Sequence, residues 1–126
     1  MYCIVLKLLY VCKMNLEKTK AQMRKGVLEL CILSIISKKS AYASDIIEKL
    51  KESELLIVEG TLYPLLTRLK NDGFLSYHWE ESKSGPPRKY YKLSPLGAKF
   101  LSELDQNWKN LYEAVNNIIE SNKTKI

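Results

Sequence analysis

The stretch from Glu59 to Gly73, EGTLYPLLTRLKNDG, carries polar side chains at the spacing of one helical face. Its leucines recur three and four residues apart, as they do on the buried side of an amphipathic helix. The opposite side would present hydroxyls, an aromatic ring and basic groups, which can hydrogen-bond to base edges and phosphates in a DNA major groove. An ordinary solvated helix face is the alternative. The candidate residues on this side are Thr61, Tyr63, Pro64, Arg68 and Lys70.

Within this helix the candidates have different expected roles. The first three lie near its start and would contact base edges or the sugar–phosphate wall. Arg68 and Lys70 would contact phosphates, although Arg68 could instead pair with Asp72 or with an acid on the preceding helix. We expect Pro64 in about the first turn of the helix, where a missing N–H costs little. Gly73 follows the last periodic leucine and predicts the helix end.

After Gly73 the apolar pattern changes from a helical period to an alternating one, which indicates strands. Residues 74–80 and 88–93 predict two strands, and residues 82–87, SKSGPP, predict the turn between them. The segment from Lys83 to Lys92 holds four basic residues and no acid, so its tip could lie along a phosphate backbone or enter a minor groove. A solvated, charged sheet edge is the alternative. The expected contacts are Lys83, Arg88 and Lys89.

Two helices are expected before this unit. Residues 27–37, VLELCILSIIS, are apolar nearly all round, as in a helix buried on most sides. A second helix covers roughly residues 43–52, with Ser40 or Ser44 available as its N-cap. Two helices, a connector, a third helix and a hairpin make a mainly α-helical fold with a small β-hairpin, a winged helix-turn-helix.

The final helix is expected to begin at Ser94-Pro95, a cap followed by proline in the first helical position, and to run to about Glu120. Its apolar residues are spaced alternately three and four apart, the pattern of a coiled-coil seam. A long exposed seam favours a partner, and a second copy is the simplest one. Packing against the first helix of the same chain is the alternative. The seam consists of Leu101, Leu104, Trp108, Leu111, Val115 and Ile118.

Length and charge agree with this organisation. A chain of 126 residues makes one modest domain, and a net charge of +6 allows an anionic partner without demanding one. We expect a DNA-binding unit over residues 14–94, followed by a dimerisation helix and polar tail over residues 95–126. Residues 1–13, MYCIVLKLLYVCK, are too short to span a bilayer and lack a signal-peptide pattern. We expect them to be a non-native or disordered extension.

The sequence contains few side chains arranged as catalytic groups usually are. Cys3, Cys12 and Cys31 form no metal-binding or disulfide pattern, and His78 is the one histidine. No nucleophile constellation or phosphate-binding glycine loop is visible. The sequence therefore predicts no metal, no cofactor and no enzymatic activity, and free cysteines suit a reducing cytoplasm.

Two motifs carry a resemblance to a known family. The first is Gly60-Thr61-Leu62-Tyr63-Pro64-Leu65-Leu66 with Arg68-Leu69 and Asp72-Gly73, and the second is residues 85–94, GPPRKYYKLS. Residues 23–119 resemble PadR-type transcriptional regulators, and the single C-terminal helix resembles the compact subgroup. The resemblance implies a homodimeric winged-helix repressor that binds double-stranded DNA through its third helix and wing. A two-fold dimer would place two such helices about one DNA turn apart, which matches a palindromic operator.

The resemblance also implies a role for Trp108. In multidrug-sensing relatives, a dimer-interface tryptophan at this position stacks flat aromatic ligands with its two-fold mate, and two facing indoles would form a polarisable slot. The alternative is a large seam residue that only fills the interface. A planar aromatic effector at Trp108 is therefore one rival function. A winged helix that binds another protein and no DNA is a second.

Overall fold

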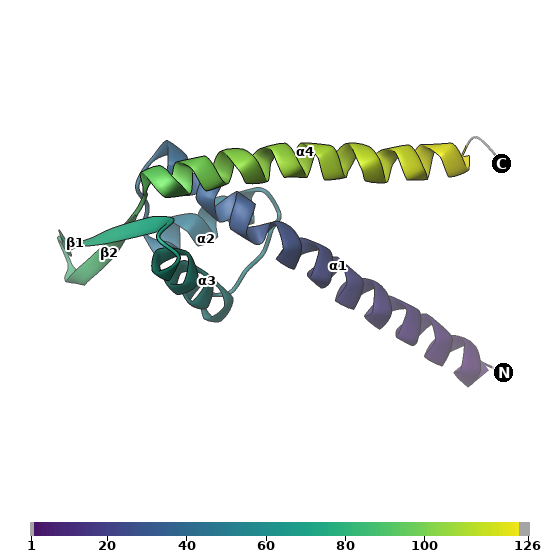
Figure 1. Ribbon diagram of the computed structural model, residues 1–126. Coiled ribbons are helices and arrows are strands. Elements are labelled where there is room, and N and C mark those ends of the chain that lie inside the picture. The colour runs from purple at the N-terminus through teal and green to yellow at the C-terminus, as the bar shows by residue number, and fades with distance from the viewer. Residues whose placement is uncertain (1, 124–126) are drawn as a thin grey trace.

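A computed structural model describes residues 2–123, which form four α-helices and one antiparallel two-stranded hairpin (Figure 1). This arrangement confirms the predicted winged helix-turn-helix with a long C-terminal helix. The elements are α1 (Tyr2–Lys38), α2 (Ala43–Glu52), α3 (Glu59–Asn71), β1 (Leu75–Ser82), β2 (Gly85–Leu93) and α4 (Pro95–Lys123).

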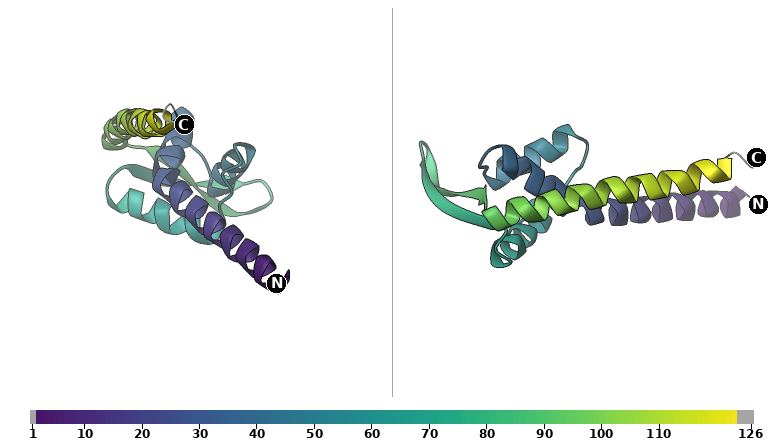
Figure 2. Two further views of the ribbon diagram at one scale, coloured as in Figure 1. Left: turned by 90° about the vertical axis from the view of Figure 1, so that its right-hand side faces the viewer. Right: turned by 45° about the horizontal axis from the view of Figure 1, so that its top comes forward.

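The core lies where the end of α1, α2, α3 and the base of the hairpin meet. Ile32 and Leu33 of α1, Ile46 of α2, and Leu62 and Leu66 of α3 have no exposed surface. Burying a side chain of this size contributes about 1.5–3 kcal/mol each. The apolar side chains of these three helices therefore converge on one small core, and the hairpin projects from one end of it (Figure 2).

Residues 2–13, expected to be a non-native or disordered extension, continue α1 without a break in the structure. Their side chains are exposed, and the buried part of the helix begins only at Leu28. No proline interrupts the segment, and adding a residue to an existing helix costs far less than starting one. The helix can thus extend from its buried C-terminal half toward the N-terminus. None of the helices within residues 2–123 combines the length and the apolar character needed to cross a membrane.

The prediction that Ser40 or Ser44 caps α2 is wrong. Tyr42 occupies the N-cap position, and its backbone N–H donates to Asp45 Oδ2 at 3.1 Å. The reason lies one residue earlier, where Ala41 exchanges two backbone hydrogen bonds with Tyr91 of β2. Because this bridge holds residue 41 extended, the helix cannot begin before it, and Ser44 falls inside the first turn.

Gly73 and Ser94 end and begin their helices as predicted. Gly73 has φ 86°, a left-handed conformation that favours glycine, directly after the end of α3. Ser94 Oγ accepts a hydrogen bond from the N–H of Gly97 at 2.9 Å and donates to the carbonyl of Gly73 at 2.6 Å. One hydroxyl therefore caps α4 and ties its start to the end of α3.

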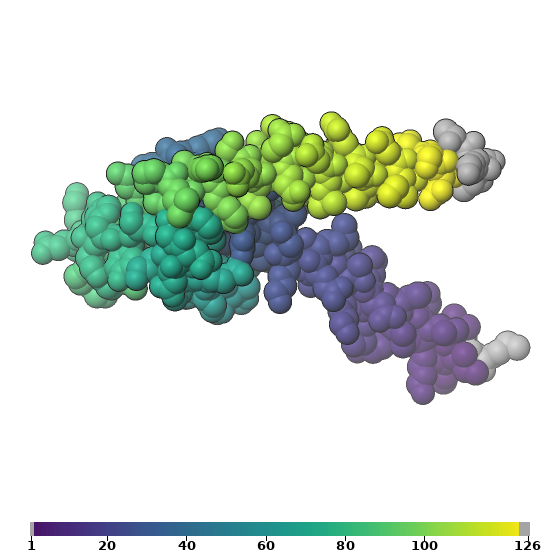
Figure 3. Space-filling view, in the orientation of Figure 1, coloured from purple at the N-terminus to yellow at the C-terminus, as the bar shows by residue number. Residues whose placement is uncertain are grey.

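The first turns of α4 rest on the core, and the remainder of the helix leaves it. Gly97 is buried so closely against the carbonyl of Phe74 that a Cβ atom would collide with it. Phe100 stacks on Phe74 with ring centroids 4.0 Å apart. Beyond these contacts α4 extends away from the hairpin, and in Figure 3 open space separates it from the N-terminal half of α1.

Candidate nucleic-acid interface

The two faces of α3 separate as the leucine spacing predicts. Leu62, Leu66 and Leu69 are buried in the core. The five polar and proline positions proposed for DNA contact are all exposed, and Tyr63 leaves 47% of its surface open. A single rigid helix therefore presents Thr61, Tyr63, Pro64, Arg68 and Lys70 to solvent.

Pro64 lies close to the start of α3, as expected. It is the sixth residue of the helix, just beyond the first turn, so its missing N–H falls where a hydrogen bond to the carbonyl of Gly60 would otherwise form. The helix begins ahead of Pro64 because Thr61 and Leu62 both donate to the carbonyl of Val58, at 3.0 and 3.1 Å. The interruption is confined to the exposed side, where water can satisfy the carbonyl.

Arg68 forms an ion pair with Glu29 of α1. The predicted alternative, an ion pair with an acidic side chain, is therefore correct, but the partner is neither Asp72 nor an acid of α2. Sequence could not indicate Glu29, because the pair depends on how α1 crosses α3. The arginine side chain remains 55% exposed, so it can still reach a phosphate, and that role stays a prediction.

The hairpin is longer and its turn tighter than predicted. The expected turn over residues 82–87 narrows to Lys83 and Ser84, since β2 already begins at Gly85. Ser82 Oγ donates to the carbonyl of Pro86 at 3.0 Å across the turn. Prolines are tolerated here because a two-stranded sheet has only edge strands. Lys83 therefore stands exposed at the tip.

Two basic residues of the hairpin, Arg88 and Lys89, lie over aromatic rings. Lys89 Nζ lies 4.5 Å from the ring centroid of Tyr77 and 5.3 Å from that of Trp79. The guanidinium of Arg88 lies 5.4 Å from the ring of Tyr42, which contacts Tyr90 edge-on at 4.0 Å. Such contacts contribute only about 0.5–1 kcal/mol each at exposed sites, yet they fix where the charges point.

A groove of about 480 Å³ runs between α3, the start of α2 and the hairpin. The sequence interpretation gave Trp79 and Tyr42 no functional role, but both line this groove together with predicted contact residues. Strand alternation was the available signal, because it places Trp79 on the same face as its cross-strand partner Lys89. The lining residues are Tyr42, Ala43, Ser44, Glu59, Tyr63, Thr67, Trp79, Pro87, Arg88, Lys89 and Tyr91.

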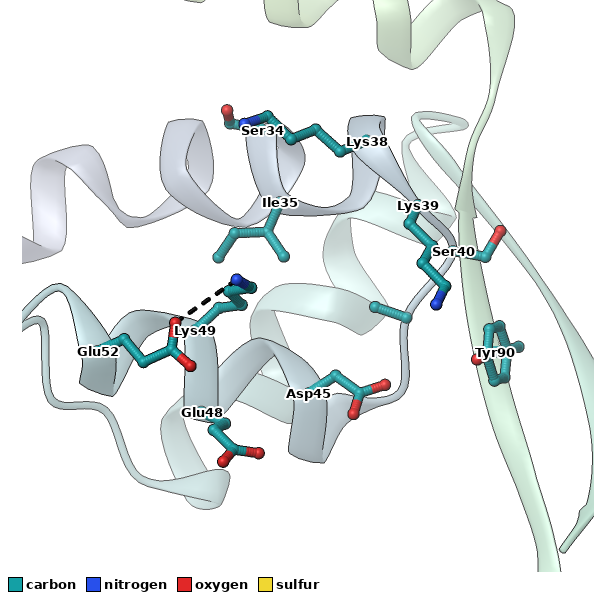
Figure 4. A pocket seen from close by; sticks show the side chains of 11 residues that line it. Ser34, Ile35, Lys38, Lys39, Ser40, Asp45, Glu48, Lys49, Glu52 and Tyr90 are labelled. Carbon is teal, nitrogen blue, oxygen red and sulfur yellow. Dashed lines mark ion pairs between the residues drawn. The ribbon is translucent and has the colours of Figure 1, made fainter.

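A second hollow, of about 430 Å³, lies between the end of α1, α2 and Tyr90 (Figure 4). Its lysines, Lys38, Lys39 and Lys49, are matched in number by the acids Asp45, Glu48 and Glu52. Lys49 pairs with Glu52 at 3.5 Å. Because positive and negative side chains balance, this hollow has no net attraction for a phosphate, unlike the basic hairpin.

The described residues offer no metal centre, since no cluster of three metal-binding side chains occurs among residues 2–123. Cys3 and Cys12 are exposed on α1, and Cys31 packs at the edge of the core. Burial raises the pKa of the Cys31 thiol above its ordinary value, which keeps it protonated and unreactive at neutral pH. In this position Cys31 acts as a small apolar residue at the edge of the core.

The seam predicted on α4 divides into two parts. Leu101 and Leu104 are half-buried against the core of their own chain. From Trp108 onward the seam is open, and Leu111 is 52% and Ile118 64% exposed. Intramolecular packing therefore accounts for the first turns only. The open part comprises Trp108, Leu111, Val115 and Ile118, and Tyr112 and Ile119 widen it.

Comparison with known proteins agrees with this geometry. The model of the transcriptional regulator PadR-like family matches residues 32–103, more than half of the chain. A PadR-like transcription factor from Bacteroides fragilis is 64% identical, with a TM-score of 0.68 over 80% of this chain and 98% of that one. A PadR family transcriptional regulator from Eggerthella lenta is 29% identical, with a TM-score of 0.82 over 88% and 97% of the two chains.

A third solved structure, a PadR-like transcriptional regulator from Bacillus cereus, is 38% identical, with a TM-score of 0.70 over 78% and 96% of the two chains. The family match spans the buried end of α1, the helix-turn-helix, the hairpin and the first turns of α4, which are the parts that form the core and the exposed basic face. The chain belongs to the PadR-like family of transcriptional regulators.

Proposed function

We propose that this regulator is a homodimeric repressor that acts in the cytoplasm and binds a palindromic DNA operator. The observation that carries the proposal is the face formed by α3 and the hairpin, whose polar and basic side chains are exposed while Leu62, Leu66 and Leu69 on the other side of α3 are buried in the core. A surface of this kind needs no further apolar partner, and its charge suits a phosphate backbone.

In this proposal α3 enters the major groove. Thr61, Tyr63 and Pro64 occupy its first half and would contact base edges or the adjacent sugars. Lys70 and the exposed part of Arg68 would contact phosphates, since both lie in the last turn. The hairpin would follow the neighbouring backbone through three basic side chains, Lys83, Arg88 and Lys89, which add affinity without reading sequence.

The dimer would form through α4. The helix has 29 residues, about 44 Å at 1.5 Å per residue, and only its first turns contact its own core. A two-fold pair of open seams would bury the exposed apolar residues on both subunits. It would also present two α3 helices to one duplex, and half-sites about 34 Å apart are the expected geometry for such a pair.

A selection from random double-stranded DNA tests the proposal. We expect recovered sites to contain an inverted repeat with half-sites about one helical turn apart, and mobility-shift titration to show two subunits per duplex. Placing a selected site at a promoter should lower transcription in a purified system. Recovery of no preferred sequence, together with no duplex binding at low salt, would favour the protein-binding alternative instead.

Effector binding at Trp108 is a second candidate function. Trp108 is 40% exposed beside Tyr112, with ring centroids 5.9 Å apart, and it borders a hollow of about 80 Å³ between α1 and α4. A second hollow beside Trp108 and Tyr112 is larger, about 250 Å³, but it is open to solvent on one side, so the proposal needs a second subunit to complete the slot. Planar dyes should quench tryptophan fluorescence, and Trp108→Ala should abolish the quenching that remains in Trp79→Phe.

A further inference from the structure

We propose that the groove between α3 and the hairpin holds one sugar–phosphate strand of the duplex, and that Trp79 packs its indole against a deoxyribose there. The inference deepens the proposed function and rests on it. It assigns Trp79, which carries no charge and no base-reading group, as a contact residue beside the basic side chains.

The position of Trp79 is the first support. Leu75, Tyr77 and Trp79 alternate along β1 and so share one face of the hairpin. Leu75 is buried in the core, and Tyr77 lies under Lys70 of α3, with Nζ 5.4 Å from the ring centroid. That face therefore looks toward α3, and Trp79 stands on it at the open end, 59% exposed.

The neighbours of the indole are the second support. Trp79 is paired in register with Lys89, whose Nζ lies 5.3 Å from the indole centroid. The edge of Tyr77 faces the indole at 6.3 Å. One ammonium is thus placed beside two aromatic rings on the wall of the groove. A phosphate bound by Lys89 would bring the apolar face of its own deoxyribose against the indole.

The groove itself is the third support. Its volume of about 480 Å³ lies within the range of small-ligand sites, and Arg88 and Lys89 on the hairpin outnumber Glu59 on α3. The α3 wall adds the hydroxyls of Tyr63 and Thr67, which are donors suited to phosphate oxygens. Basic groups and hydroxyls suit phosphate oxygens, and an exposed aromatic ring suits the apolar face of a deoxyribose, so the lining together matches a sugar–phosphate strand.

Salt dependence separates the indole contact from the ionic ones. Trp79→Ala should weaken binding about tenfold on a selected duplex and on a scrambled one alike, and the slope of log affinity against log salt should stay unchanged. Lys89→Ala should lower that slope by about one per subunit, because one phosphate contact is lost. Trp79→Phe should restore most of the affinity. Tyr10→Ala, an aromatic change at a similarly exposed site on α1, is the matched control and should have no effect.

Fluorine-labelled tryptophan gives a direct readout, since the chain has two tryptophans. The resonance of Trp79, assigned with Trp79→Phe, should shift and lose its solvent isotope effect when a saturating duplex is added. An unchanged Trp79 resonance, or wild-type affinity in Trp79→Ala while Arg88→Ala with Lys89→Ala still weakens binding, would overturn this inference and leave the proposed function standing. Failure of the wild-type protein to bind any duplex would overturn both.

Discussion

The α3–hairpin face and the distal half of α4 differ in how far their apolar residues are buried. On α3 three of the four leucines are buried and Leu65 is half-buried, and the exposed side presents mainly polar, basic and aromatic groups. On α4 beyond Leu104 no apolar seam residue is buried in the described subunit. A single subunit therefore buries most apolar side chains of α3 but leaves those of distal α4 exposed to solvent.

This difference indicates which kind of partner each region suits. A finished polar surface can bind a hydrated, charged ligand reversibly without exposing the core, and its affinity depends on salt. An exposed apolar seam gains most from another apolar surface, which a two-fold mate would supply in the proposed dimer. The predictions below separate the two, from the largest expected effect to the smallest.

Charges in the α4 seam should have the largest effect. Leu111→Asp with Val115→Asp places two carboxylates where the proposed dimer is dry, and we expect the dimer dissociation constant to rise at least a thousandfold, about 4 kcal/mol. Sedimentation equilibrium measures the change. Because both side chains are exposed in one subunit, circular dichroism should show a helical, folded chain.

The control for this experiment is Gln106→Glu, which adds a charge to an exposed position of α4 outside the seam. It should leave the dimer intact. Equal weakening by both changes would point to a general charge effect and argue against a specific seam.

Gly97→Ala tests the junction of the two regions. A Cβ atom there meets the carbonyl of Phe74, so α4 must shift away from the base of the hairpin. We expect the free energy of unfolding, measured in urea, to fall by about 1–3 kcal/mol. Gly60→Ala is the matched control, since a Cβ there meets nothing within 4 Å. That change should be neutral or stabilise the helix by up to about 1 kcal/mol. Equal stability of the two variants would contradict the close approach.

Removing the charges of the hairpin should weaken DNA binding with a salt signature. Arg88→Ala with Lys89→Ala deletes two phosphate contacts per subunit, and we expect affinity to fall about ten- to a hundredfold at low salt with a flatter salt dependence. Fluorescence anisotropy across a salt series measures both. An unchanged slope would show that these side chains do not contact phosphates.

The ion pair between Arg68 and Glu29 should contribute least. Half of the arginine side chain remains in water, which screens the pair, so a double-mutant cycle with Arg68→Ala and Glu29→Ala should give a coupling of about 0.5–1 kcal/mol in the free energy of unfolding. If Arg68→Ala also reduces DNA affinity as strongly as Arg88→Ala, then Arg68 contributes more to DNA binding than to the stability of the fold.

Local patterns were sufficient to predict most of the fold. The leucine spacing of α3, the glycine after it and the Ser94-Pro95 pair each depend on residues a few positions apart, and each appears as predicted. The same holds for the change to alternation that predicts the hairpin. Such features follow from helix and strand geometry, so a single sequence contains them.

Features that depend on distant residues could not be predicted in this way. The cap of α2 is displaced by a bridge between Ala41 and Tyr91, and Arg68 pairs with Glu29 nearly forty positions away. The groove beside Trp79 requires α2, α3 and the hairpin to be placed together. In each case tertiary contacts decide the outcome, and alternation along β1 was the only available hint.

The number of subunits on one duplex tests the central claim most directly. Sedimentation of the protein with a selected duplex should show two chains per duplex, and a dimer in the absence of DNA, with both states lost in Leu111→Asp with Val115→Asp. A single chain that binds the duplex at full affinity, or a dimer that survives the seam variant, would contradict the account.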